Sequence, residues 1–346
     1  MKNKTGNLVM KSFSVFKVLT VFLFMIQLVF AQTKTGTTIG QFLLIEPSGR
    51  YMGMGNAAVT FYDDITAAYY NPAAVGWLSG YGVQFTHSLW IADIQYDYVA
   101  ALVSLGSIGN LQVSLTSLTS GEIKVRTVEQ PKGTGEYYSV QDFAIGVGYG
   151  RQLIDRLSIG FHINYVQETI WHSSLATMAL NIGTIFQIIP GKLTLGASIS
   201  NFGLPASFDG RDLIIQYDQD PDRYGDNSSL PGKVLTGKFP LPIIFRVGLS
   251  APYQINETQK IRLAINAFHP NNNTESISLG GEWMFKDLIA LRTGYQHLFQ
   301  QDSETGLTFG LGLHLKVGNT KMSIDYAWAD RGRLKETQHF TIGLYF

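Results

Sequence analysis

The chain has 346 residues, with 26 lysines and arginines, 26 aspartates and glutamates, and no cysteine. Zero net charge provides no positive field for phosphate backbones, so we expect no nucleic-acid partner. The lack of cysteine excludes disulfides, thiolate zinc sites and cysteine nucleophiles. Charged residues make up only 15% of the chain, against about 25% in soluble domains. Charge is therefore avoided over much of the surface.

Residues 1–31 have the features of a signal peptide. Four lysines precede the uncharged run 18–30, and Val29 and Ala31 are small residues of the kind that signal peptidase reads. The apolar run is shorter than the ~20 residues of a membrane-spanning helix. The sequence thus predicts an exported protein whose mature chain begins at Gln32. No later segment has 18 consecutive apolar residues, so a membrane protein with this sequence must span as a barrel.

From Tyr81 onward, apolar residues alternate with polar residues, which indicates strands. In 156–165, for example, Leu157, Ile159 and Phe161 alternate with Ser158, Gly160 and His162. A soluble β-sandwich also alternates, but its strands usually stop at ~5–6 residues, whereas a tilted membrane strand needs ~9–11. The strands we expect are 81–90, 94–105, 110–118, 137–150, 156–171, 174–189, 192–202, 241–251, 259–268, 274–285, 288–298, 305–317, 319–329 and 337–346.

The connections fall into two classes that alternate along the chain. One class is short, as at 106–109 and 190–191, and the other is mostly long and polar, with the longest members at 119–136 and 203–240. Two connections, 91–93 and 252–258, break this rule. Outer-membrane barrels have short turns on one side and long loops outside the cell. The prediction is an all-β, transmembrane antiparallel barrel of about 14 strands at 81–346, surrounded by outer-membrane lipid.

The last residue, Phe346, continues the apolar face of Leu344. In bacterial barrels such a terminal aromatic residue resembles the signal that is read by the barrel assembly machinery, which we therefore expect as a partner. The alternative is a strand that ends on phenylalanine by chance.

Residues 32–80 do not alternate and are rich in glycine and alanine. The stretch 64–70 predicts a short helix, with Asp63 or Asp64 as its cap. The run FLLIEPSGRYMGMGNAAVTFYDDITAAYYNPAAVGWL resembles the N-terminal segment of the PorV/PorQ family, a branch of the FadL-like outer-membrane proteins. The matching pieces are 42–45 with Pro47, Arg50, the run 52–55, Asp64, and Asn71-Pro72-Ala73.

The resemblance implies that this segment is a hatch that folds inward and blocks the lumen. Gly53 and Gly55 would let its backbone pack against the wall and adopt conformations closed to other residues. Asn71, held extended by Pro72, would hydrogen-bond to backbone groups inside the barrel. The alternative is a surface arm, which would leave a markedly apolar segment in water.

The sequence contains no complete motif for catalysis or for binding a nucleotide or metal. The run 53–55 lacks the third glycine of a dinucleotide loop, and Asp63 and Asp64 suit a helix cap. The seven histidines have no metal spacing, and His162 and His314 are interpreted as lumen-facing. We expect no catalytic residues, cofactor or metal. A catalytic Ser-His pair that meets across strands, as in a lipase-like barrel, is the alternative that the sequence leaves open.

The loop 203–240 begins like a calcium loop but does not complete the motif. Asp218, Asp220, Asp222 and Asp226 have the initial spacing, but Arg223 and Ser229 occupy the positions of the required glycine and glutamate. A solvated acidic loop is the better interpretation. With Tyr217 and Tyr224, this loop is also the best candidate for a partner-binding surface.

Two function classes follow from the resemblance. The PorV branch implies a component of type IX secretion that receives exported cargo proteins at the cell surface, and the opening FLLIEP favours this hypothesis. The FadL branch implies passive uptake of hydrophobic ligands past a movable hatch. A purely structural wall protein is the third alternative.

Overall fold

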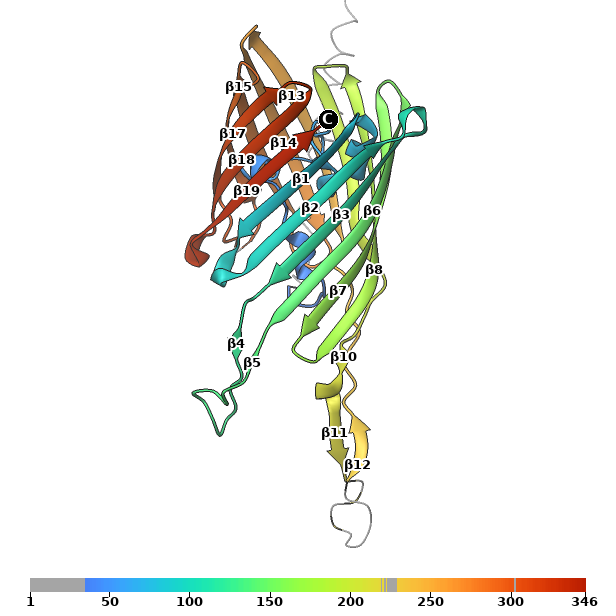
Figure 1. Cartoon of the computed structure of the whole chain (residues 1–346), viewed down its shortest axis with the longest axis vertical. Helices are drawn as coiled ribbons and strands as arrows, with labels where there is room; N and C mark the ends of the chain where they lie inside the picture. The colour runs from blue at the N-terminus through green and yellow to red at the C-terminus, as the bar shows by residue number, and fades with distance from the viewer. Residues whose placement is uncertain (1–34, 219, 221, 223–228, 302) are drawn as a thin grey trace, which may run out of the picture. The chain divides into compact units, whose positions relative to one another are not determined.

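The computed structural model describes residues 35–218, 220, 222, 229–301 and 303–346 (Figure 1). The predicted signal peptide lies outside the described residues. Fourteen strands form one closed antiparallel barrel, which confirms the predicted fold class. In chain order they are β1 (Tyr81–Leu89), β2 (Gln95–Ser104), β3 (Asn110–Thr119), β6 (Val140–Ile154), β7 (Leu157–Ile170), β8 (Ser173–Ile189), β9 (Leu193–Gly203), β13 (Ile244–Asn256), β14 (Gln259–Pro270), β15 (Ser276–Phe285), β16 (Ile289–Leu298), β17 (Leu307–Val317), β18 (Thr320–Asp330) and β19 (Glu336–Tyr345).

The apolar face of each strand points outward. On β7, Ile159 and Phe161 are 45% and 44% exposed, whereas Ser158 and His162 are 0% and 6% exposed. A protein folded in water would bury the apolar set instead. This inverted pattern identifies the outer surface as the part that contacts lipid and the inner face as a polar lumen.

The connections divide into a short-turn end and a long-loop end. At the short-turn end the strands are joined by 105–109, 155–156, 190–192, 257–258, 286–288 and 318–319, and the barrel starts and finishes there at Tyr81 and Phe346. At the long-loop end, the described parts of 120–139 and 204–239 project beyond the rim (Figure 1). They carry the hairpins β4 (Ile123–Lys124)–β5 (Tyr137–Tyr138) and β11 (Ile214–Tyr217)–β12 (Leu230–Lys233), together with β10 (Asp209–Gly210) and the 3-10 helix η6 (Arg211–Leu213). Three other connections contain η4 (Ile91–Asp93), η5 (Gly106–Ile108) and η7 (Gly332–Leu334).

Strand β13 differs from the sequence prediction. The predicted strand 241–251 begins at Ile244 and continues past Pro252 to Asn256. Pairing with β9 ends at Ser250, so from Pro252 onward β13 pairs only with β14. A proline lacks an N–H donor but fits a strand with one free edge. The connection that broke the loop rule at 252–258 is therefore a short turn at 257–258.

The N-terminal segment, defined here as residues 35–80, contains only short helical pieces: η2 (Gln41–Leu44), α2 (Gly49–Met52), α3 (Ala67–Tyr70) and η3 (Pro72–Trp77). The predicted helix 64–70 was too long, because only its last turn is helical. Asp64 still caps that turn, since its Oδ1 accepts hydrogen bonds from Ala67 N at 3.0 Å and Thr66 Oγ1 at 2.7 Å. Among the described residues, no helix is long and apolar enough to cross a bilayer.

Candidate functional site

The N-terminal segment occupies the lumen from one end of the barrel to the other. At the long-loop end, Ile39 N donates to Pro240 O at 3.1 Å and Asn272 Nδ2 donates to Thr38 Oγ1 at 2.9 Å. Deeper in the lumen, Tyr51 and Tyr70 are fully buried. The segment joins β1 at the short-turn end. The space inside the wall is therefore filled by packed side chains over much of its height.

Glycines in the wall make room for the N-terminal segment. At each of them, an added Cβ atom would lie within 3.0 Å of an atom of the segment, which real Cβ atoms avoid. They come from eight neighbouring or nearby strands and are Gly150, Gly160, Gly183, Gly196, Gly248, Gly280, Gly294 and Gly310. We call this set the glycine seat. It accounts for part of the high glycine content, which the sequence pattern alone did not explain.

Arg50 connects the N-terminal segment to the wall through buried ion pairs. Its guanidinium lies 2.8 Å from Glu282 Oε2 on β15, 3.0 Å from Asp63 Oδ2 and 3.2 Å from Asp64 Oδ2. Burial raises the pKa of Asp64, an effect that the positive charge of Arg50 opposes. Burial also disfavours the charged form of Asp63, but Arg262 and Arg50 hold the pKa of that carboxyl well below its usual range. The cluster therefore depends on Arg50 as its central cation.

The ion-pair cluster continues along the inner face of the wall to neighbouring strands. Arg292 on β16 lies 2.6 Å from Asp325 Oδ1 on β18 and 3.7 Å from Glu282 Oε1, and Arg262 on β14 lies 2.8 Å from Asp63 Oδ2. The sequence pattern did not single out these wall residues. Their inward direction was evident from alternation, but their meeting depends on the register of strands far apart in the chain.

Gly53 and Gly55 play different roles. Gly55 has φ +63°, a left-handed conformation that favours glycine, and its N–H donates to Thr308 Oγ1 at 3.0 Å. Gly53 has φ −60°, which any residue adopts, so the expectation of a special conformation was wrong there. Glycine is needed at position 53 because there is no space for a side chain: a Cβ atom would lie 2.8 Å from the Cα of Gly310.

Asn71 and Pro72 form a hydrogen-bonded corner. Asn71 is extended, with φ −153°, and Pro72 opens η3. The side-chain Nδ2 of Asn71 donates to Val59 O at 2.7 Å and to Thr184 O at 3.0 Å, and its Oδ1 accepts from Ala73 N at 3.1 Å. The residue thus ties two parts of the N-terminal segment to strand β8.

Asn71→Ala is expected to loosen this corner. The substitution leaves buried backbone groups unpaired, at a cost of about 1–3 kcal/mol for each group. Amide hydrogen exchange should become faster in residues 67–77, whereas Asn319→Ala, in an exposed turn, should leave it unchanged. Unchanged exchange in the Asn71 variant would show that the corner does not hold the segment.

The other predicted residues are dispersed. Phe346 is 63% exposed and completes the barrel seam, where its N donates to Tyr81 O at 2.8 Å. Its role as an assembly signal stays a prediction. His162 lies 3.1 Å from Ser114 Oγ and His314 lies 3.7 Å from Asp325 Oδ1, both on the lumen side. Tyr224, Arg223 and Asp226 of the acidic loop lie outside the described residues.

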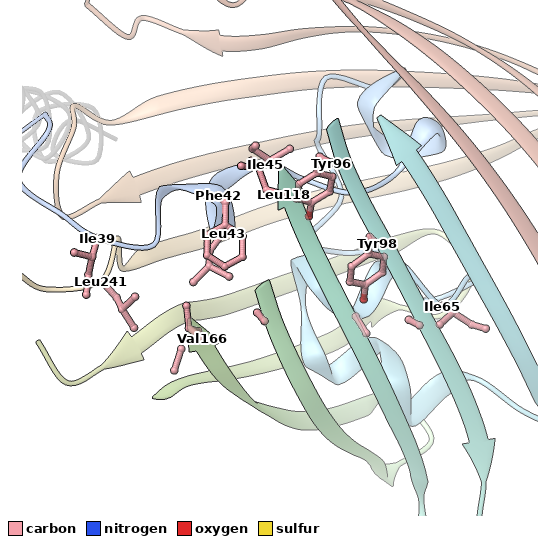
Figure 2. Packing of buried hydrophobic residues seen from close by; sticks show 14 of the residues in the cluster. Ile39, Phe42, Leu43, Ile45, Ile65, Tyr96, Tyr98, Leu118, Val166 and Leu241 are labelled. Atoms are coloured by element: carbon pink, nitrogen blue, oxygen red, sulfur yellow. The ribbon is translucent and has the colours of Figure 1, made fainter. Parts of the chain in front are cut away.

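A cavity of about 370 Å³ opens at the long-loop end, between the N-terminal segment and the wall. We call it the mouth cavity. Most of its lining is apolar, but two carboxylates face it from β6 and β7. Its lining residues are Gln41, Phe42, Leu44, Ile45, Trp90, Ile94, Leu118, Asp142 and Glu168. Phe42, Ile45 and Leu118 belong to one apolar cluster that joins the segment to the wall (Figure 2).

No protein-family model matches the chain, and no curated protein matches it either. Solved structures do match. The toluene transporter TodX of Pseudomonas putida has a TM-score of 0.55 at 13% identity, covering 87% of this chain and 97% of that one. The toluene transporter TbuX of Ralstonia pickettii has a TM-score of 0.53 at 12% identity, covering 87% and 97%.

A FadL homologue of Pseudomonas aeruginosa has a TM-score of 0.53 at 11% identity, covering 91% of this chain and 99% of that one. The chain has the FadL-like barrel fold. With its lipid-facing exterior, it is a bacterial outer-membrane β-barrel. At these identities the likeness extends to the fold alone, so membership of the PorV/PorQ family stays a prediction.

Proposed function

We propose that this barrel takes up hydrophobic small molecules passively across the outer membrane, with the N-terminal segment as its hatch. The observation that carries the proposal is the apolar mouth cavity above a lumen that the segment fills. Short turns face the periplasm in barrels of this kind, so the mouth cavity faces the cell exterior. The FadL-like fold, shared with toluene transporters, supports the same role.

A filled lumen favours selective passage over a permanently open aqueous pore. A hydrophobic molecule in the mouth cavity meets Phe42 and Ile45 of the N-terminal segment. The segment is held by hydrogen bonds, ion pairs, close contacts with the glycine seat and apolar packing against the wall. None of these contacts is covalent, so the segment can be displaced without breaking a bond, and a hydrophobic molecule can replace part of the apolar packing. Displacement of the hatch is therefore the expected opening step.

A cleavable cross-link tests this step. We expect Thr38→Cys/Asn272→Cys to join the outer end of the segment to the wall, because the two side chains are hydrogen-bonded at 2.9 Å. The chain has no native cysteine, so the cross-link would be unique. Intact cells with an intracellular toluene-oxidising enzyme would report the initial uptake of labelled toluene. Cross-linking should reduce uptake to the level of cells without the barrel, and cleavage should restore it.

The matched control is His87→Cys/Asp97→Cys, which joins β1 to β2 directly across the wall. This cross-link does not include the N-terminal segment and should leave toluene uptake unchanged. If uptake continues when the Thr38–Asn272 pair is cross-linked, displacement of the outer end of the hatch is not required.

Secretion is a second candidate, supported by the exposed apolar residues of one loop. On the hairpin β11–β12 and just beyond it, Ile214, Tyr217 and Leu235 are 61%, 51% and 89% exposed, as in a partner-binding surface. If the barrel serves type IX secretion, deletion of its gene should leave cargo proteins in the periplasm. Normal cargo display in the deletion strain would exclude this candidate.

A further inference from the structure

Two carboxylates face each other in the mouth cavity. Asp142 on β6 and Glu168 on β7 are directly paired in the strand register, and both point inward. Like charges at directly opposed positions destabilise a sheet. In the described part of the chain, neither carboxylate has a lysine or arginine as its counter-ion. The arrangement is costly for the barrel alone.

Hydrogen bonding satisfies this pair only in part. Glu168 is 9% exposed, and its Oε1 accepts a hydrogen bond from Gly40 N at 2.7 Å. Asp142 Oδ1 is shielded from solvent and has no donor among the described residues. A buried acceptor without a donor costs free energy, and a charged acceptor costs more. A ligand that supplies N–H donors and positive charge would remove both costs.

The rest of the cavity lining indicates that the body of such a ligand is apolar. Phe42, Leu44 and Trp90 present apolar surface beside the carboxylates. The volume of about 370 Å³ is within the range of ~300–1,000 Å³ found for small-molecule sites. An apolar wall with a small number of placed polar groups selects both the shape and the orientation of a ligand.

We propose that the mouth cavity binds small amphiphiles with an apolar body and a protonated amine, and that Asp142 and Glu168 hold the ammonium group. This inference rests on the proposed uptake function and narrows its substrate class. A hydrophobic cation approaching from outside would place its ammonium group between the two carboxylates. Its apolar body would then lie against Phe42 and Trp90, next to the hatch.

The test measures binding to the full chain in lipid nanodiscs by calorimetry, with empty nanodiscs as the blank. Three probes share one ring and differ in the head group: 2-phenylethylamine, 2-phenylethanol and 3-phenylpropanoate. We expect the amine to bind at least about tenfold more tightly than the alcohol, because hydrogen bonds between charged groups are stronger than those of a neutral hydroxyl. The carboxylate should bind most weakly. Equal affinities for the amine and the alcohol would overturn the inference.

The double variant Asp142→Asn/Glu168→Gln keeps the shape of both side chains and removes their charge. It should lose the amine preference, retain the affinity for 2-phenylethanol within about twofold, and be at least as stable as the native chain, because a like-charge pair is removed. The matched control Asp93→Asn removes one exposed charge near the same end and should keep the preference. An amine preference that survives in the double variant would also overturn the inference.

Failure of this inference is distinguishable from failure of the uptake function. If the barrel accelerates toluene uptake but binds the amine no better than the alcohol, the uptake function stands and the carboxylate pair has no ligand role. If toluene uptake is unaffected by the barrel, the uptake function fails whatever the result of the binding measurement.

Discussion

Gly280→Val is expected to dislodge the N-terminal segment and open the barrel to ions. Any side chain at this position of β15 meets the carbonyl group of Met54 in the segment. Overpacking a filled interior costs about 1–3 kcal/mol, and here the backbone of the segment has to move. Planar-bilayer recordings should show frequent open events in the variant and a closed native barrel.

The neighbouring Gly281 provides a matched control. An added Cβ atom there would lie 3.6 Å from Leu263 Cδ2 and 3.9 Å from Thr293 O, in ordinary contact with the wall and not with the segment. Gly281→Val should therefore remain closed. Gly280→Ala, with a smaller change, keeps the test valid if the valine variant fails to fold. A Gly280→Ala barrel that stays closed, with unchanged hydrogen exchange at residues 53–60, would contradict the role of the glycine seat.

Arg50→Met is expected to cause the largest loss of stability. It leaves Asp64 without its ion-pair partner in a buried site and weakens the attachment to Glu282. Breaking a buried ion pair by removing one member costs about 3–5 kcal/mol. The free energy of unfolding in urea, measured in lipid vesicles, should fall by this amount, and exchange should accelerate throughout the segment.

Two further variants separate the buried cluster from general charge effects. Lys260→Met breaks an exposed ion pair with Asp287 and should cost less than about 1 kcal/mol. Adding Asp64→Asn to Arg50→Met removes the stranded carboxylate and should recover part of the loss. If Arg50→Met costs no more than Lys260→Met, the cluster does not anchor the segment.

Much of the barrel was predictable because each strand has one face in lipid and one in a polar lumen. The alternation of Ile159 and Phe161 with Ser158 and His162 records that difference directly, so strand number and loop order follow from the sequence. Strand ends were less certain. Pro252 marked an apparent break, but only the pairing of β13 shows that one edge is free at that point.

The candidate site was predictable only in part. The corner formed by Asn71 and Pro72 follows from local backbone rules, and the structure supplies the carbonyl groups that Asn71 binds. The pairing of Asp142 with Glu168 had a usable signal, because both acids occupy inward positions of adjacent strands. The contacts of Arg50 with Glu282 did not, since these residues are 232 positions apart and meet only when the barrel closes around the segment.

Uptake by a host without general porins tests the central claim most directly. Intact cells that produce the full chain should accumulate labelled toluene several-fold faster than cells without it, while glucose uptake stays at the level of the empty host. This result is expected from a barrel that admits hydrophobic molecules through the mouth cavity but has no open, water-filled pore through which glucose could pass. Equal toluene rates with and without the chain, or a parallel rise in glucose uptake, would contradict the account.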